Sequence, residues 1–162
     1  MIRTLRFTAA LFLATPVILS SGAGLSAQEI ADFAPLPAAQ ANMQDFIWHK
    51  RPVVVFADSA ADPAFQEQMR SLQAAWPDLA ARDVVIITDT DPETMSDVRR
   101  TLRPRGFSIV VVEKDGTVAQ RKPTPRGGRE ITSAIDKMPI RREEIRNAPA
   151  TLNNSGGNRV GG

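Results

Sequence analysis

The chain has 162 residues, and its 20 Lys and Arg against 18 Asp and Glu give a formal net charge of +2. It contains no cysteine. This excludes disulfide exchange, thiolate attack on a peroxide and metal sites built from cysteine.

Residues 1–27 have the layout of a secretory signal. A basic start is followed by a mostly apolar run over residues 7–19 and by small residues up to Ala27. The apolar run is shorter than the roughly 20 residues of a membrane-spanning helix. We therefore expect cleavage after Ala27, with the bond after Ala23 as the alternative, and a mature protein that is periplasmic or secreted and has no membrane span.

Cleavage would also change the charge. It removes Arg3 and Arg6 but no acid, which leaves 18 basic against 18 acidic residues. Because a neutral chain lacks the electrostatic footprint of a nucleic-acid-binding protein, we expect no nucleic-acid partner.

The first half of the mature chain predicts a lead-in, a strand and a helix. Residues 28–45 are rich in alanine and proline and are expected to be a lead-in segment, with a short helix possible over residues 39–48. Residues 53–57 form an apolar, β-branched run typical of a strand buried on both faces. Asp62 and Pro63 provide an N-cap and a proline at the first helical position. The helix that follows carries one apolar stripe for the core, made of Phe65, Met69, Leu72, Trp76 and Leu79.

A second strand and helix follow. Residues 84–88 repeat the buried-strand pattern, and a strand, helix and strand of this spacing pair in parallel. Asp91 with Pro92 predicts the start of the next helix. We expect that helix to bury Met95, Val98 and Leu102 and to point Arg99, Arg100 and Arg103 toward solvent.

The last part predicts a hairpin and a helix. Residues 107–113 read as a third strand, and Asp115-Gly116 predicts a two-residue turn with positive φ values. Residues 118–122 are polar and suit an edge strand. A last helix carries Ile131, Ile135 and Met138 and is expected to end at Pro139. From residue 141 we expect a frayed helix and, over residues 147–162, a disordered tail.

This order of elements predicts an α/β fold. A parallel strand–helix–strand unit followed by a helix, a hairpin and a closing helix is the β-α-β-α-β-β-α order of the thioredoxin core. We expect a three-layer α/β/α domain over residues 46–146, with a four-stranded mixed sheet in which the first and third strands are central.

Four stretches resemble a known family. They are residues 52–68, residues 82–87, residues 106–116 and the closing Ile135-Asp-Lys-Met-Pro-Ile-Arg-Arg-Glu-Glu144. Together they are similar to the family called domain of unknown function 4174. The resemblance implies a thioredoxin- or peroxiredoxin-like fold and an exported bacterial protein, and it implies little about activity.

The loop after the first strand is where a thioredoxin-like domain carries its reactive thiols. Here the two thiol positions fall on Ala60 or Ala61 and on Pro63 or Ala64. Only three polar side chains remain in the loop, and they are weak catalytic candidates: Asp58, Ser59 and Asp62. Ser59 would need a base, and the single histidine, His49, precedes the strand. We therefore expect no catalytic residue and no cofactor.

Other clusters have simpler interpretations. Residues 48–51 are cationic and aromatic, and we expect a solvated strand entry with Trp48 packed on the core rather than a partner contact. Asp89, Asp91 and Glu93 alternate as in a calcium loop, but the rest of that pattern is absent, so capping by Asp91 is favoured and no metal is expected.

Two basic runs stand out, one from Arg99 to Arg105 and one from Arg121 to Arg129. Either could face an acidic partner, although solvated surface is the default.

The sequence thus predicts an exported, cysteine-free thioredoxin-like domain that binds an unknown protein or cell-envelope partner without catalysis. The alternatives are a peroxiredoxin-like or oxidoreductase-related enzyme that works without cysteine and a small-ligand carrier.

Overall fold

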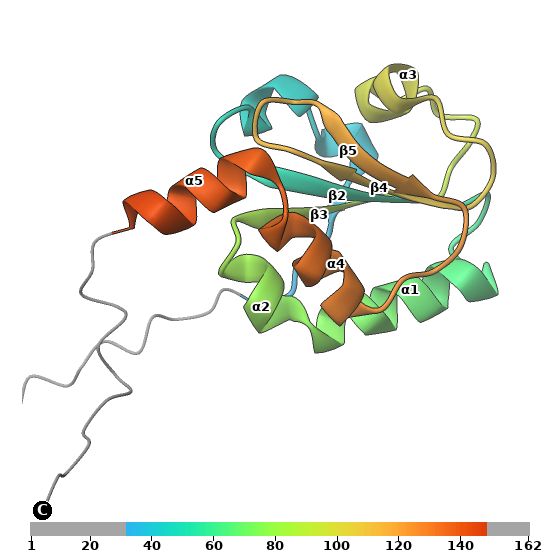
Figure 1. Ribbon diagram of the computed structural model, residues 1–162. Helices are drawn as coiled ribbons and strands as arrows, with labels where there is room; N and C mark the ends of the chain where they lie inside the picture. The colour runs from blue at the N-terminus through green and yellow to red at the C-terminus, as the bar shows by residue number, and fades with distance from the viewer. Residues whose placement is uncertain (1–31, 149–162) are drawn as a thin grey trace, which may run out of the picture.

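The computed structural model describes residues 32–148 (Figure 1). The expected signal over residues 1–27 and most of the expected tail therefore lie outside the described residues. No helix among residues 32–148 is both long and apolar enough to cross a membrane.

Within the described residues, five strands form one mixed sheet in the order β1-β3-β2-β4-β5 (Figure 1). The strands are β1 (Leu36–Pro37), β2 (Arg51–Phe56), β3 (Val84–Asp89), β4 (Ser108–Val112) and β5 (Val118–Lys122). β3 runs parallel to β1 and β2, whereas β4 runs antiparallel to both β2 and β5. The four long strands, the central place of β2 and β4, and the polar edge strand β5 confirm the sequence prediction.

The fifth strand corrects that prediction, which had four. β1 comes from the expected irregular lead-in, and its two residues pair with Ile87 and Thr88 of β3. A strand of two residues has no period from which it could be recognised, and its second residue is a proline.

Helices cover both faces of the sheet (Figure 1). On one face lie α1 (Pro63–Ala74), α2 (Trp76–Ala80) and α4 (Gly128–Asp136). On the other face lie α3 (Asp97–Leu102) and the short 3₁₀ helices η1 (Ala38–Gln40) and η2 (Met43–Phe46). A last helix, α5 (Pro139–Asn147), extends beyond the end of the sheet.

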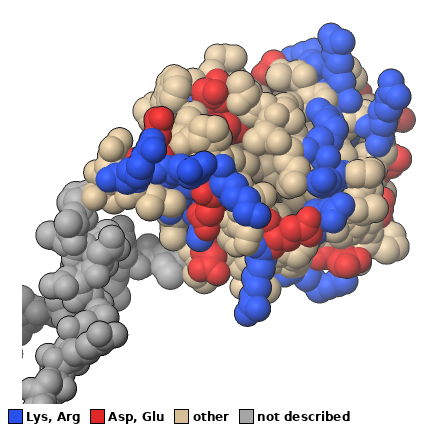
Figure 2. All heavy atoms as spheres, viewed as in Figure 1, with Lys and Arg blue, Asp and Glu red and all other residues tan. Residues whose placement is uncertain are grey.

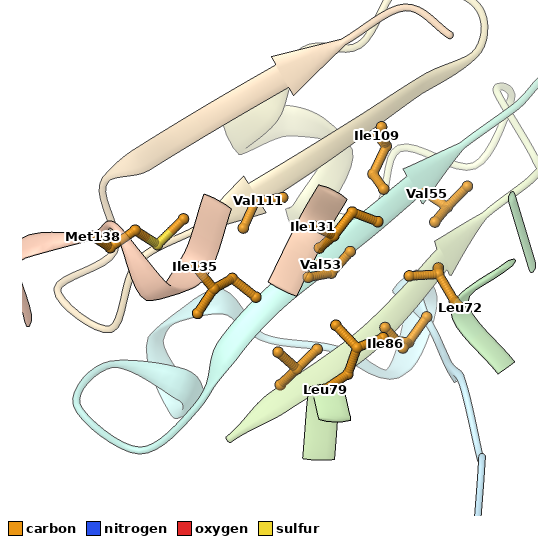
Figure 3. Packing of buried hydrophobic residues seen from close by; sticks show 11 residues of the cluster. Val53, Val55, Leu72, Leu79, Ile86, Ile109, Val111, Ile131, Ile135 and Met138 are labelled. Carbon is orange, nitrogen blue, oxygen red and sulfur yellow. The ribbon is translucent and has the colours of Figure 1, made fainter. Parts of the chain in front are cut away.

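Alternate residues of β2 point to opposite faces of the sheet, and a hydrophobic cluster lies on each face. All six residues of this strand are buried, but Val53 and Val55 face α1, α2 and α4, whereas Val54 and Phe56 face α3. Figure 3 shows the first cluster, in which Ile131 of α4 packs over Val53. The predicted apolar stripe is confirmed as core, although its helix is divided: α1 ends at Ala74, and Trp76 and Leu79 lie in α2. Leu72 and Leu79 are fully buried, and the three other members are partly buried against the same cluster.

The helix boundaries differ in several places. The possible helix over residues 39–48 is two 3₁₀ helices instead. The helix expected from Asp91 begins only at Asp97, with the Ser96 hydroxyl accepting a hydrogen bond from the Arg99 N–H as N-cap. Met95 therefore precedes the helix and is 57% exposed instead of buried. α4 ends at Asp136, before Pro139, and the helix expected from residue 141 begins slightly earlier, at Pro139, because proline is well suited to the first turn of a helix.

The hairpin turn is also different from the prediction. Gly116 has a positive φ of 86° but Asp115 does not, and the Gly116 N–H donates to the Glu113 carbonyl. The Glu113 N–H in turn donates to the Thr117 carbonyl. The loop is thus a three-residue turn with glycine in the left-handed position, rather than a two-residue turn.

Candidate functional site

The candidate site is the loop between β2 and α1, residues 58–62, together with the first turn of α1. Asp58, Ser59, Ala60 and Ala61 are exposed. The loop lies at the carboxyl end of a central strand, where open α/β sheets bind their ligands. Its position is therefore right for a functional site, and its chemistry depends on three polar side chains.

Two of these side chains are engaged in local structure. The Asp62 carboxylate accepts hydrogen bonds from the N–H groups of Ala64, at 2.8 Å, and Phe65, at 3.4 Å. The Ser59 hydroxyl oxygen accepts a hydrogen bond from the Ala61 N–H at 3.1 Å. Asp62 is thus an N-cap of α1, and Ser59 closes a turn of the loop.

Ser59 has no histidine within reach among residues 32–148. The single histidine, His49, precedes β2, and Ser59 follows it. Six extended residues between them correspond to about 20 Å at roughly 3.3 Å per residue. A nucleophile and its base must lie within hydrogen-bond reach. The structure therefore holds Asp58, Ser59 and Asp62 in one loop, and no hydrogen bond within residues 32–148 joins the Ser59 hydroxyl to another side chain.

A buried ion pair lies beside this loop. Asp89 ends β3 opposite Phe56, and its carboxylate receives three hydrogen bonds from Arg99, the shortest at 2.7 Å, and one from the Ser96 hydroxyl. The Arg99 guanidinium also lies over the Phe56 ring, 5.6 Å from its centroid. The expectation that Arg99 faces solvent is therefore wrong: its side chain is only 11% exposed, because a buried carboxylate needs a charged partner.

The alternating acids Asp89, Asp91 and Glu93 do not form a metal site. Asp89 is paired with Arg99, whereas Asp91 caps a turn by accepting hydrogen bonds from the Thr94 hydroxyl and from the N–H groups of Thr94 and Glu93. These hydrogen bonds lower the pKa of Asp91. Asp91 thus caps this turn and not α3. Over residues 32–148 no three His, Asp or Glu side chains gather in a way that could hold a metal ion.

The cationic cluster before β2 is divided by the fold. Trp48 is 63% exposed, with a positive φ of 64°, so the expectation that it packs on the core is wrong. The backbone N–H of Trp48 donates to the Lys114 carbonyl, which fixes this loop against the β4–β5 hairpin. His49 and Lys50 are exposed as well.

Arg51, by contrast, is completely buried. Its guanidinium donates to Glu113 Oε1 and to the Arg82 carbonyl, both at 2.9 Å. A third nitrogen lies 2.9 Å from Glu144 Oε1, an ion pair that is not aligned as a hydrogen bond.

The charges around Arg51 form a network at the amino end of β2, opposite the candidate loop. Lys114 contacts Glu144 at 2.8 Å and Asp83 at 2.7 Å. Burial alone would lower the pKa of Lys114, but the bonds to these two carboxylates outweigh it and raise the pKa. Because every charge here has a partner of opposite sign, the network holds elements together and offers no free reactive group.

Two hollows in the described surface lie away from residues 58–64. One groove of about 850 Å³ runs between the β4–β5 hairpin, α4 and the start of α5. A second, of about 530 Å³, lies beside α3. Neither is lined by a residue of the loop.

Comparison with known proteins gives a family and a fold. A family model described as domain of unknown function (DUF4174) matches residues 42–144. No curated protein matches the chain in sequence. Among solved structures, chloroplastic thioredoxin z is similar with a TM-score of 0.50 and 16% identity, over 66% of this chain and 96% of that one. The reduced 2-Cys peroxiredoxin of Plasmodium vivax is similar with a TM-score of 0.50 and 15% identity, over 65% and 85%. At this identity the likeness shows the thioredoxin fold alone.

Proposed function

The chain belongs to the family of domain of unknown function DUF4174. Because neither thiol position of its thioredoxin-type loop holds a nucleophile, we propose that it is a non-catalytic binding module. The supporting observation is the loop itself. Alanine or proline occupies each expected thiol position, the Ser59 hydroxyl accepts a backbone hydrogen bond, and Asp62 caps α1. A scaffold without reactive groups can still present its surface to another molecule.

We place this module in the periplasm or cell envelope. The support is the pattern of residues 1–27, with its basic start, short apolar run and small residues before Gln28. The partner is then a protein or another component of the same compartment.

The competing function is a cysteine-free enzyme that uses Ser59 with Asp58 or Asp62. Such an enzyme would need a base near Ser59, and no hydrogen bond joins Ser59 to another side chain within the described part of the chain. No observation favours this function, but it makes a different experimental prediction.

The test measures turnover and binding on one sample. The protein purified from the periplasm is assayed for peroxide consumption and insulin reduction, and captured partners are identified and rebound in pure form by calorimetry. We expect no turnover and a stoichiometric complex. Turnover that is lost in Ser59→Ala but kept in Ser133→Ala, a matched change at an exposed serine of α4, would overturn the proposal.

A further inference from the structure

We propose that the groove beside α3 binds an acidic segment of a partner protein. This inference rests on the proposed binding function and names its surface. The surface, called here the α3 groove, consists of the groove beside α3 and the arginines around the carboxyl end of that helix: Arg100, Arg103, Arg105 and Arg121.

The fold brings two distant basic segments together at this surface. Residues 98–112 contain four arginines and no acid, and residues 116–129 contain four basic residues and no acid. Arg121 of β5 donates a hydrogen bond to the Leu102 carbonyl at 2.7 Å, so its guanidinium lies at the carboxyl end of α3. Figure 2 shows Lys and Arg side chains gathered at the end of the molecule where α3 lies. Neither segment alone reveals this convergence.

Several of these positive charges are not neutralised by the protein. Arg103 and Arg105 are exposed, and neither side chain forms an ion pair or hydrogen bond within residues 32–148. Arg100 is 59% exposed and has only a distant contact with Asp97, at 3.8 Å. The hydrogen bond of Arg121 is to a neutral carbonyl. Because arginine presents paired donors that fit a carboxylate, this surface fits acidic side chains.

The groove itself is concave and partly apolar. It has a volume of about 530 Å³ and is lined by Pro92, Met95, Arg99, Arg100, Arg103 and Pro104. Met95 offers an exposed, adaptable apolar side chain. Arg99 is held by Asp89, so one wall of the groove is fixed before any ligand arrives. An acidic segment with an apolar residue would thus find both charge and apolar contact.

The lining favours a peptide over other polyanions. No aromatic side chain lines the groove, so bases of a single-stranded nucleic acid have no stacking platform. A concave wall with one methionine also differs from the apolar face that anchors a protein in an anionic membrane. An extended acidic peptide is the occupant that matches the shape and the charge.

The test uses the protein purified from the periplasm and a fluorescein-labelled peptide of four Glu-Glu-Leu repeats, read by fluorescence anisotropy. The variant is Arg103→Gln with Arg105→Gln, since neither side chain has a partner to lose. The matched control is Arg142→Gln with Arg146→Gln on α5, which removes the same charge from an exposed surface elsewhere. Thermal melts confirm that both variants fold.

We expect the first variant to bind the peptide about tenfold more weakly and the control to bind nearly as wild type, with affinity falling as salt rises. Equal losses in both variants would overturn the inference, because they would show attraction to net charge alone. Binding of phosphatidylglycerol vesicles or an oligonucleotide without binding of the peptide would also overturn it. If the peptide does not bind, the inference about the α3 groove is wrong but the proposed binding function still stands. That function is refuted only by the turnover assay.

Discussion

Glu144 Oε1 lies 2.9 Å from Nη2 of Arg51, which joins the last helix to the first residue of a central strand. None of the nine residues of α5 is buried, so apolar packing contributes little to its position. The closing segment supplies further contacts. Arg141 of α5 lies 3.6 Å from Asp136, the last residue of α4, and Asp136 in turn receives two hydrogen bonds from Arg82. Through Glu144 and Arg141, the charges of this segment thus attach α5 to the rest of the domain.

Glu144→Gln is expected to loosen α5. The change removes the carboxylate that faces Arg51 and Lys114, and Arg51 is fully buried. Leaving a buried charge with one partner fewer should lower the free energy of unfolding by about 2 kcal/mol. Urea unfolding measures this loss, and hydrogen exchange should show faster exchange in α5. The control is Glu143→Gln, whose exposed side chain contacts only Arg146, at 3.6 Å. Equal effects of the two changes would contradict the role of Arg51.

The same carboxylate predicts a pH dependence. Burial alone would raise the pKa of Glu144, but the contacts with Lys114 and Arg51 outweigh it and lower the pKa to about 2, from an ordinary value of 4.5. A lowered pKa stabilises the fold above the ordinary value, and this contribution disappears as the pH falls toward about 2. Unfolding measured from pH 5 down to about 2 should therefore show a steeper loss of stability in the wild type than in Glu144→Gln, by at most about 3 kcal/mol. Parallel curves would refute the shift.

The fold could be predicted from sequence where burial restricts the residue types. Strands buried on both faces accept little besides β-branched and apolar residues, so β2, β3 and β4 are visible as runs. β1 and α5 were not predictable in the same way. β1 is too short to show the alternation of apolar residues that marks a strand. Proline occurs both after the end of a helix and in the first turn of one, so Pro139 alone does not fix where α5 begins.

For the candidate site, the sequence predicts only which reactive groups are absent. Residue types alone show that the loop over residues 58–64 has no thiol and no histidine. The buried pairs Arg51–Glu113 and Arg99–Asp89 could not be found in this way. Lys50 and Arg51 are both cations at a strand entry, and only the pairing of the sheet decides which one is enclosed.

Gly128→Ala tests the contact between α1 and α4. A Cβ added at Gly128 would lie 2.2 Å from the Cβ of Ala75 and 3.1 Å from the Ser71 carbonyl oxygen. The two segments must separate to relieve this overlap, so we expect a loss of about 2 kcal/mol in the free energy of unfolding. Gly127→Ala is the matched control, because a Cβ at that position has nothing within 4 Å. If both variants melt at the same temperature, the close approach is not important for stability.

Export predicts a defined amino terminus. Protein recovered from the periplasmic fraction of expressing cells should begin at Gln28, as read by amino-terminal sequencing, because the residues before it suit the signal peptidase. Cleavage after Ala23 would instead leave Gly24 as the first residue. Recovery of the whole chain from the cytoplasm alone, still beginning at Met1, would refute the proposed location.

Asp62→Ala separates a structural role of the loop from a functional one. The Asp62 carboxylate accepts hydrogen bonds from the Ala64 and Phe65 N–H groups at the start of α1. Loss of an N-cap costs about 1 kcal/mol, so the midpoint of urea unfolding should fall while the slope stays unchanged. Asp58→Ala removes a carboxylate from the same exposed loop without removing a cap and should leave stability nearly unchanged. If Asp62 acts only as a cap, the Asp62→Ala protein binds the acidic peptide as well as the wild type does. A loss of peptide binding with unchanged stability would instead make the loop part of the binding surface.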